Sequence, residues 1–205
     1  MINFDSGKNA IQHSINVNNY KSYLEVGTSN GQTFLYLKCD RKVGIDPSMN
    51  DEVSHLEVYN MISDEFFEIN KDSFDIIFID GDHDSKVVTR DFNNAIRCLN
   101  PGGSIFLHDS LPETEEAQLV PCPKHLQSGG IWNGDAWRTV AGLLDTPYTY
   151  LTADTQCGLT VVKWPGPETC PITDVIPSDI SYDTFKKNQN KYLKLVPAND
   201  FMLHL

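Results

Sequence analysis

The chain has 205 residues, a length typical of one domain with a substantial hydrophobic core. Its 28 acidic side chains outnumber the 16 Lys and Arg side chains, which gives a formal net charge of -12. Such a charge repels nucleic acid phosphates and anionic lipid surfaces, so the sequence predicts neither a nucleic acid nor a membrane partner. No stretch approaches the roughly 18 apolar residues of a membrane span.

The cysteines and the first residues indicate the compartment. The five cysteines are odd in number, lie far apart and form no C-x-x-C pair, which is typical of reduced thiols. The first residues lack the basic and apolar regions of a secretion signal. Together these features predict a cytoplasmic protein.

Short apolar runs alternate with helix-length segments along the first half of the chain. They are not patterned with a period of two, which favours buried parallel strands in βαβ units. An N-terminal helical segment precedes them. The runs lie at residues 22–26, 42–46, 57–61, 74–80 and 104–109.

Two helices are clear from their periodicity. Residues 85–99 carry Val88 and Phe92 at helical spacing, between two predicted strands. A second helix is expected over residues 135–145, with Asp135 as its N-cap.

The rest of the chain mixes strands with loops. Residues 147–152 and 158–164 predict two strands, close enough to form an antiparallel pair at a sheet edge. Residues 110–134 contain Pro and Gly without periodicity and predict a long lid or binding loop. Residues 165–182 are a Pro-rich connector, and residues 182–196 predict a closing helix.

The first strand ends in the sequence YLEVGTSNGQ, with an acid just before two glycines. Ligands of a doubly wound sheet lie beyond the carboxyl ends of the strands. Gly27 allows a tight turn and close approach of a ligand, and Gly31 lets the next helix begin without a side chain in the way. The alternative is that this turn needs glycine for its geometry alone.

Two acids at strand ends suggest which ligand binds. Glu25 would repel a pyrophosphate, and the G-x-G-x-x-G of dinucleotide-binding proteins is absent, so a ligand with an amino or sulfonium group fits better. Asp46, at the end of the second strand, can accept hydrogen bonds from both hydroxyls of a ribose.

The fourth and fifth strands end in a second polar group. IDGDH supplies Asp80, Asp82 and His83, and LHDS supplies His108 and Asp109. A histidine with an ordinary pKa near 6.5 suits a general base. As alternatives, His83 could orient its loop through a hydrogen bond, and His108 could be a buried strand residue.

With these residues the chain resembles the class I S-adenosylmethionine-dependent methyltransferases, and specifically methyltransferase family 24. The resemblance covers about residues 20–163. It is carried by YLEVGTSNGQT, KVGIDPS, SDEFFE, the long block from IFIDGDH to SLPETEE, GDAWRTV and ADTQCGLTVV. It implies an α/β fold: a Rossmann-like, doubly wound, seven-stranded sheet with the last strand antiparallel, in three α/β/α layers.

The resemblance also implies a domain organisation, with one methyltransferase domain over residues 1–205. Its parts would be an N-terminal helical segment at 1–21, a core at 22–163 that includes the lid loop at 110–134, and a C-terminal connector and helix at 164–205.

Carried over residue by residue, the resemblance implies S-adenosylmethionine as cofactor. Ser63 has an alternative interpretation as a helix N-cap. The third glycine of the common E-x-G-x-G-x-G form is absent, which leaves open how the methionine carboxylate is bound. The implied cofactor-binding residues are Glu25, Gly27, Thr28, Ser29, Gly31, Asp46, Pro47, Ser63, Asp64, Asp80 and Gly81.

Catalytic roles are implied for Asp80, His83, His108 and Asp109. Asp80 and Asp109 also resemble the carboxylates that hold a divalent ion in metal-dependent catechol and sugar O-methyltransferases, which would make Mg²⁺ a second cofactor. Those relatives carry an acid or amide beside the second carboxylate, where this chain has Ser110.

Trp137 and Arg138 are candidate substrate-binding residues. Helical spacing gives Trp137 an alternative place in the core, whereas Arg138 could face the lid or an anionic substrate group.

The sequence therefore predicts a methyltransferase that O-methylates a small hydroxylated acceptor, such as a sugar or glycan precursor. The alternative is a module that binds S-adenosylmethionine or a nucleotide without catalysis. The acid and histidine cluster favours the enzyme, because a binding module has no use for it. Neither the acceptor nor the oligomeric state follows from the sequence.

Overall fold

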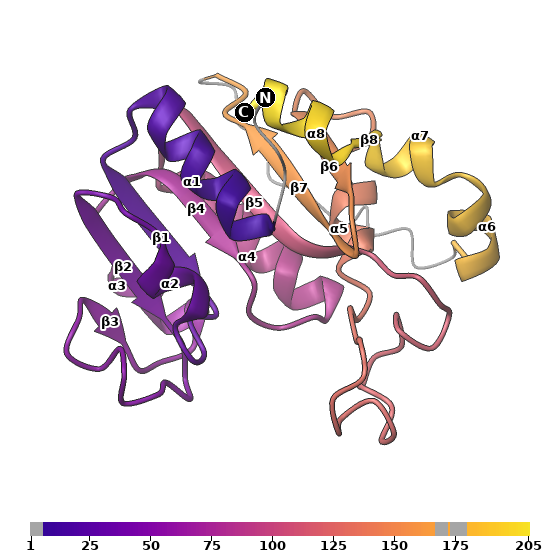
Figure 1. The fold of residues 1–205 in the computed structure, drawn as a ribbon, viewed down its shortest axis with the longest axis horizontal. Coiled ribbons are helices and arrows are strands. Elements are labelled where there is room, and N and C mark those ends of the chain that lie inside the picture. Colours follow the sequence, from indigo (N-terminus) through magenta and orange to yellow (C-terminus); the bar gives the residue numbers. More distant parts are fainter. Residues whose placement is uncertain (1–5, 167–171, 173–179) are drawn as a thin grey trace.

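The computed structural model describes residues 6–166, 172 and 180–205, in which eight strands form one mixed sheet (Figure 1). Their order across the sheet is β3-β2-β1-β4-β5-β7-β6-β8. The strands are β1 Ser22–Val26, β2 Arg41–Ile45, β3 Val58–Tyr59, β4 Phe74–Ile79, β5 Leu99–Leu111, β6 Thr149–Asp154, β7 Cys157–Lys163 and β8 Leu195–Pro197. The helices are α1 Gly7–Asn18, α2 Gln32–Tyr36, α3 Ser63–Ile69, α4 Ser85–Arg97, α5 Trp137–Ala141, α6 Tyr182–Lys187, α7 Gln189–Leu193, α8 Ala198–Phe201 and the short η1 Met202–His204.

Strands β1 to β5 run parallel, as the sequence predicts. Val26 pairs with Ile45 on one side and with Ile79 on the other, and Ile79 pairs with Leu107. Strands in this register end at the same edge of the sheet. The residues that follow them are therefore brought together.

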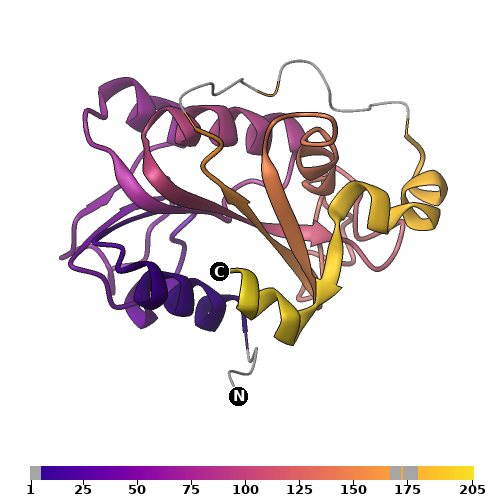
Figure 2. The ribbon, with the colours of Figure 1, turned by 90° about the horizontal axis from the view of Figure 1, so that it is seen from above.

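Helices cover both faces of the sheet, which gives three layers (Figure 2). Alternate residues of β4 show why: Ile77 and Ile79 pack toward α3, α4 and α5, whereas Ile76 and Phe78 pack toward α1, α2 and α8. A strand buried on both faces needs apolar residues at successive positions, which explains its continuous apolar run. The Rossmann-like α/β prediction is confirmed.

The predicted seven strands become eight, because the segment expected to be one closing helix is divided. Asn188 has a non-helical backbone (φ -122°, ψ 22°) and separates α6 from α7. Lys194 is left-handed (φ 51°) and ends α7, after which Leu195 pairs with Thr152. The antiparallel strand is β7, and the last strand, β8, runs parallel to β6.

Two other elements are shorter than predicted. The third strand keeps only the two residues of β3. The helix expected over residues 135–145 is helical only over α5, and Asp135 does not cap it with its side chain. Asp135 Oδ1 instead accepts a hydrogen bond from the Ser85 backbone N–H at 2.7 Å, at the start of α4. A residue that the sequence assigns to one helix thus caps another.

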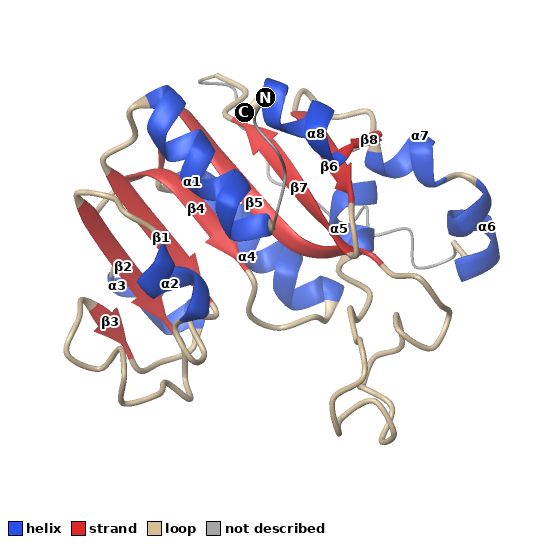
Figure 3. Ribbon diagram, in the orientation of Figure 1, coloured by secondary structure: helices blue, strands red, loops and turns tan. Residues whose placement is uncertain are grey.

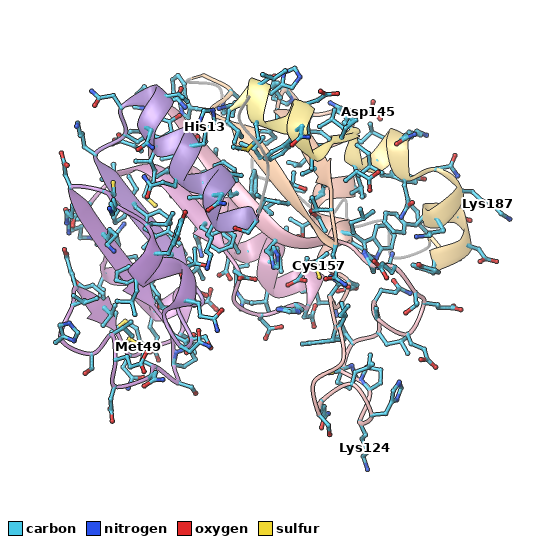
Figure 4. All side chains as sticks on the ribbon, viewed as in Figure 1. His13, Met49, Lys124, Asp145, Cys157 and Lys187 are labelled. Carbon is cyan, nitrogen blue, oxygen red and sulfur yellow. The ribbon has the colours of Figure 1, made fainter. Side chains whose placement is uncertain are left out.

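The long loop after β5 projects away from the body of the protein (Figure 3), and Lys124 lies near its far end (Figure 4). The predicted lid started at residue 110, but Ser110 still belongs to β5. The base of the loop is tied together, since the Asn133 N–H donates to the Ala117 carbonyl at 2.9 Å. The Trp132 indole donates to the Leu119 carbonyl at 2.7 Å.

The remaining expectations concern the cysteines, membranes and the connector. Cys39, Cys98, Cys122 and Cys157 are free thiols, and Cys170 lies outside the described residues. Within the part of the chain that the structure describes, no helix combines the length and apolar character of a membrane span. Most of the connector expected at residues 165–182 also lies outside the described residues.

Candidate active site

A cavity of about 770 Å³ lies at the carboxyl edge of the parallel strands. It brings together most of the residues that the sequence singles out. Gly31, Trp137 and Arg138 do not line it. Its lining includes Glu25, Gly27, Thr28, Ser29, Asp46, Pro47, Ser63, Asp64, Asp80, Gly81, His83, His108 and Asp109.

Gly27 is required by the protein's own backbone. Its φ is +92°, and a Cβ at this position would lie 2.2 Å from the Asp80 carbonyl oxygen. The two strand ends are held together there, since the Asp80 N–H donates to the Val26 carbonyl at 2.8 Å. The sequence predicts that a ligand approaches Gly27 closely. In the structure, the backbone of the turn after β4 already lies against it.

Gly31 serves the geometry of the next helix. It is the left-handed N-cap of α2 (φ +77°), and a Cβ there would lie 2.4 Å from Val53 Cγ1. This supports the purely geometric alternative for Gly31.

Glu25 is a buried carboxyl group, with 2% of its surface exposed. The Tyr23 hydroxyl donates a hydrogen bond to Glu25 Oε2. Burial raises the pKa of Glu25 from 4.5 to about 8, although the Tyr23 hydrogen bond opposes the shift. Without a cation beside it, Glu25 is therefore mostly protonated at neutral pH.

This burial predicts how stability depends on pH. A carboxyl with a raised pKa binds its proton more tightly in the folded state, so its contribution is complete below about pH 4.5 and is lost as pH rises to about 8. In ligand-free protein, we expect the wild type to lose stability relative to Glu25→Gln across this window, by at most about 1.4 kcal/mol per pH unit. Urea unfolding of both proteins at several pH values measures it, and parallel pH profiles would contradict it.

Asp46 organises the turn beside Gly27. Its Oδ2 accepts from the Ser29 N–H at 2.7 Å, and its Oδ1 accepts from the Ser48 N–H at 2.7 Å. Each carboxylate oxygen can accept more than one hydrogen bond. Asp46 lines the cavity and can therefore still receive hydroxyl groups from a ligand.

Ser63 and Asp64 lie at the start of α3, on the cavity wall. Ser63 is the first helical residue and does not cap the helix, so the N-cap interpretation is wrong. Its hydroxyl donates to Asp91 Oδ1 at 2.6 Å, while Asp64 pairs with Arg90 at 2.7 Å. Asp91 also lines the cavity and was missed in the sequence, where it is one polar residue in a helical pattern.

His108 bridges two carboxylates at the ends of β4 and β5. Its Nδ1 lies 3.0 Å from Asp80 Oδ1 and 3.2 Å from Asp109 Oδ2. Burial lowers the pKa of His108, but the hydrogen bonds and charges of these two carboxylates outweigh it and hold this pKa well above its ordinary value. The two carboxylates therefore favour the protonated ring of His108, which is a hydrogen-bonded residue of β5.

His83 is held through both ring nitrogens. Nδ1 lies 3.1 Å from the Trp132 carbonyl oxygen, which can only accept, so Nδ1 carries a proton. Nε2 lies 3.2 Å from Asp109 Oδ2. If His83 is neutral, the lone pair of Nε2 faces the Asp109 carboxylate, which is unfavourable. The contact becomes favourable when Nε2 is protonated or when a cation lies between the two groups.

Asp109 is the common partner in this cluster. It is buried and left-handed (φ +57°), and its Oδ1 accepts from the Asn133 side chain at 2.8 Å. The His108 hydrogen bond and charge, together with His83 and Asn133, outweigh burial and lower the pKa of Asp109. Nothing in the local sequence connects Asn133 with Asp109, because the loop path alone brings them together.

Asp80, His83 and Asp109 could also hold a metal ion. Each offers one ligand atom, and these atoms lie within 4.8 Å of one another. The second nitrogen of His83 donates to a carbonyl, and Asp109 accepts from an amide, as is usual around metal ligands. The residues therefore fit a divalent cation, although His108 uses the same carboxylate oxygens.

Trp137 and Arg138 lie away from the cavity. Trp137 is fully buried and stacks on Phe185 with ring centroids 3.9 Å apart, as its core alternative predicts. Arg138 lies over the Trp137 ring and donates to the Ile180 carbonyl at 3.2 Å. The structure does not bring either residue to the predicted site.

Comparison with known proteins gives one family match and one relative. Residues 24–110 match the model of a methyltransferase domain family, methyltransferase family 24. The uncharacterized protein R132 of Acanthamoeba polyphaga mimivirus is 27% identical over 124 residues, a match that covers 49% of this chain and 56% of that protein. The chain thus spans just over half the length of this relative.

Solved structures share the fold at low sequence identity. SAH-bound methyltransferase PaMTH1 from Podospora anserina has a TM-score of 0.60 and 16% identity, with 77% of each chain covered. A candidate caffeoyl-CoA O-methyltransferase from Staphylococcus aureus has a TM-score of 0.55 and 18% identity, covering 76% of this chain and 81% of that one. Residues 24–110 thus match a methyltransferase domain family, and the described part of the chain shares the fold of these methyltransferase structures.

Proposed function

We propose that the protein transfers the methyl group of S-adenosylmethionine to a hydroxyl oxygen of a small acceptor, such as a sugar or glycan precursor. One observation carries the proposal: a single cavity is lined both by the acids that end β1 and β2 and by the acid and histidine cluster that ends β4 and β5. Donor and acceptor must lie side by side for an in-line displacement, and one cavity allows this.

The cofactor end of the cavity is proposed from the chemistry of its lining. The amino group and sulfonium of S-adenosylmethionine supply the positive charge that would ionise buried Glu25, and Asp46 would accept the ribose hydroxyls. The S-adenosylhomocysteine bound to PaMTH1 supports the same class of ligand.

His83 is the proposed general base. Its proton on Nδ1 is fixed by the Trp132 carbonyl, so Nε2 is the nitrogen that can take the acceptor's hydroxyl proton. The methyl group moves from sulfur to the acceptor oxygen as that O–H bond breaks. Asp109 already lies 3.2 Å from Nε2 and would stabilise the imidazolium that forms. A protonated His108 would balance the charges of the two carboxylates.

A divalent ion is the alternative to His83 as base, because Nε2 cannot both bind a metal and take a proton while Nδ1 donates to the Trp132 carbonyl. Asp80, Asp109 and His83 would hold it, and it would lower the pKa of the acceptor hydroxyl. Mg²⁺ prefers oxygen ligands, whereas the imidazole of His83 also suits Mn²⁺ or Zn²⁺. Ser110 stands where the metal-dependent relatives carry an acid or amide, which argues against the same set of ligands in this chain.

The function is tested by incubating the purified protein with methyl-labelled S-adenosylmethionine and a panel of hydroxylated acceptors, with and without chelator. Labelled product supports the enzyme, and loss in chelator with recovery on adding Mg²⁺ or Mn²⁺ supports the metal. Cofactor binding without transfer to any acceptor would favour the alternative, a binding module. Tighter binding of NAD than of S-adenosylmethionine in calorimetry would overturn both interpretations.

Asp46→Ala should weaken binding of S-adenosylmethionine by at least tenfold. Removing a carboxylate that accepts paired hydrogen bonds typically costs about 1.5 to 3 kcal/mol. Calorimetry on both proteins measures the change. Asp51→Ala, on the exposed segment after the same strand, is the control. Unchanged affinity in a folded Asp46→Ala protein would remove Asp46 from the cofactor site.

A further inference from the structure

We infer that Trp132, Asn133 and Gly134, at the end of the projecting loop, form a positioning element of the reaction centre. In this element Asn133 orients Asp109, and Trp132 orients His83. The inference deepens the proposed function, and its predicted effects on kcat rest on that function. The contacts themselves exist in the ligand-free protein.

Trp132 holds the ring of His83 in two ways. Its indole stacks on the imidazole with centroids 4.6 Å apart and planes 16° apart. Its carbonyl oxygen lies 3.1 Å from Nδ1. The stack fixes the plane of the ring, and the carbonyl fixes which nitrogen carries the proton. A turned His83 ring could keep the stack, but it could not move Nε2 away from Asp109 without losing the contact between Nδ1 and the Trp132 carbonyl.

The backbone of His83 is held by the residues that follow. The Asp135 N–H donates to the His83 carbonyl at 3.0 Å. Gly134 has φ +56°, and a Cβ there would lie 2.1 Å from the His83 carbonyl oxygen. Only a glycine lets the loop pass this close to the turn after β4.

Asn133 holds the carboxylate that faces His83. It is fully buried, and its Nδ2 donates to Asp109 Oδ1 at 2.8 Å. Its Oδ1 is buried without a hydrogen-bond partner among the described residues. A buried orphan acceptor lowers stability, so an apolar residue would suit folding better. The polar contacts of the Asn133 side chain are with Asp109 and with the Cys157 thiol, and of these two groups Asp109 belongs to the acid and histidine cluster.

Asn133 does not line the cavity, so it acts through Asp109 and is not itself catalytic. Asp109 needs such support because its backbone is left-handed and its Oδ2 faces both His83 and His108. One short segment thus fixes both the proposed base and its carboxylate partner. The base of the loop is therefore part of the reaction centre.

The experiment compares Asn133→Ala, Asn133→Ser and Asn133→Asp with Gln127→Ala, a matched amide truncation on the exposed part of the same loop. We expect Asn133→Ala to lower kcat about 10- to 100-fold, with the acceptor KM and the cofactor Kd within about twofold, as for a positioning hydrogen bond. Asn133→Ser restores a donor and should recover part of kcat. Asn133→Asp places a second carboxylate beside Asp109 and should be the slowest. Gln127→Ala should match the wild type.

A second readout does not depend on turnover. In the ligand-free protein, ¹⁵N NMR of the histidine rings should show His83 protonated at Nδ1. Trp132→Ala removes the stacked indole but keeps the backbone carbonyl, so it should leave Nδ1 protonated and increase the mobility of the ring in ¹⁵N relaxation. If this holds but no acceptor is methylated, the proposed function fails and the positioning element stands. Near-normal kcat in Asn133→Ala, or a His83 ring as rigid in Trp132→Ala as in the wild type, would overturn the inference.

Discussion

Replacing His83 by glutamine should lower kcat by about 10²- to 10⁴-fold, the usual contribution of a positioned general base, and leave the affinity for S-adenosylmethionine unchanged. The Nδ1 proton of His83 is fixed by the Trp132 carbonyl, which leaves Nε2, beside Asp109, as the nitrogen that can take a proton. Nδ1 of His108 instead lies between two carboxylates. Glutamine keeps polar groups that can contact Trp132 and Asp109 but cannot take a proton at neutral pH.

The measurement is the initial rate of methyl transfer at saturating cofactor, with calorimetry for the cofactor affinity. His125→Gln is the control, since His125 has 62% of its side chain exposed and pairs with Glu116 on the projecting loop. A normal rate in His83→Gln combined with a large loss in His108→Gln would reverse the proposed roles. Normal rates in both, and in Asp80→Asn, would mean that the chemistry lies elsewhere.

Gly27→Ala should destabilise the protein by about 2 to 4 kcal/mol and abolish measurable cofactor binding. The added Cβ would lie 2.2 Å from the Asp80 carbonyl oxygen and 2.5 Å from the Gly81 Cα. These are backbone atoms that cannot rotate aside, so the ends of β1 and β4 must separate. The cavity is lined by both ends and should lose its shape.

Gly102→Ala separates this packing effect from backbone strain. Gly102 also has a positive φ (+81°), but a Cβ there would meet nothing within 4 Å. It should cost only about 1 kcal/mol, the conformational penalty alone, and leave cofactor binding intact. Urea unfolding and calorimetry on both variants give the comparison. Equal losses in the two variants would show that the approach to Asp80 is unimportant.

The sequence determined the sheet and the residues at its edge. SYLEV and FDIIFI are apolar at successive positions because parallel strands are buried on both faces, and they form β1 and β4 where the pattern predicts. Strands in parallel register end together. Placing Asp46, Asp80 and Asp109 at strand ends was therefore enough to predict that they share a cavity.

The C-terminal helices and strand could not be predicted from sequence pattern in the same way. Residues 182–196 have a helical composition, but Lys194 takes a left-handed conformation and β8 forms because the edge of β6 is there to pair with. Pairing with a strand more than 40 residues away overrides a local preference.

The chemistry within the cluster was also decided by tertiary structure. The sequence left His83 and His108 as equal candidates for the base, because a histidine's proton affinity and tautomer depend on what faces each nitrogen. Those partners are Asp80 for His108, and Trp132 with Asp109 for His83, and they come from separate strands and from a loop. Asn133 reaches Asp109 only because the loop returns to the strand from which it left. Local sequence sets which groups are present at the edge of the sheet, but hydrogen bonds between residues 24 to 49 positions apart, which only the folded chain makes, set what each can do.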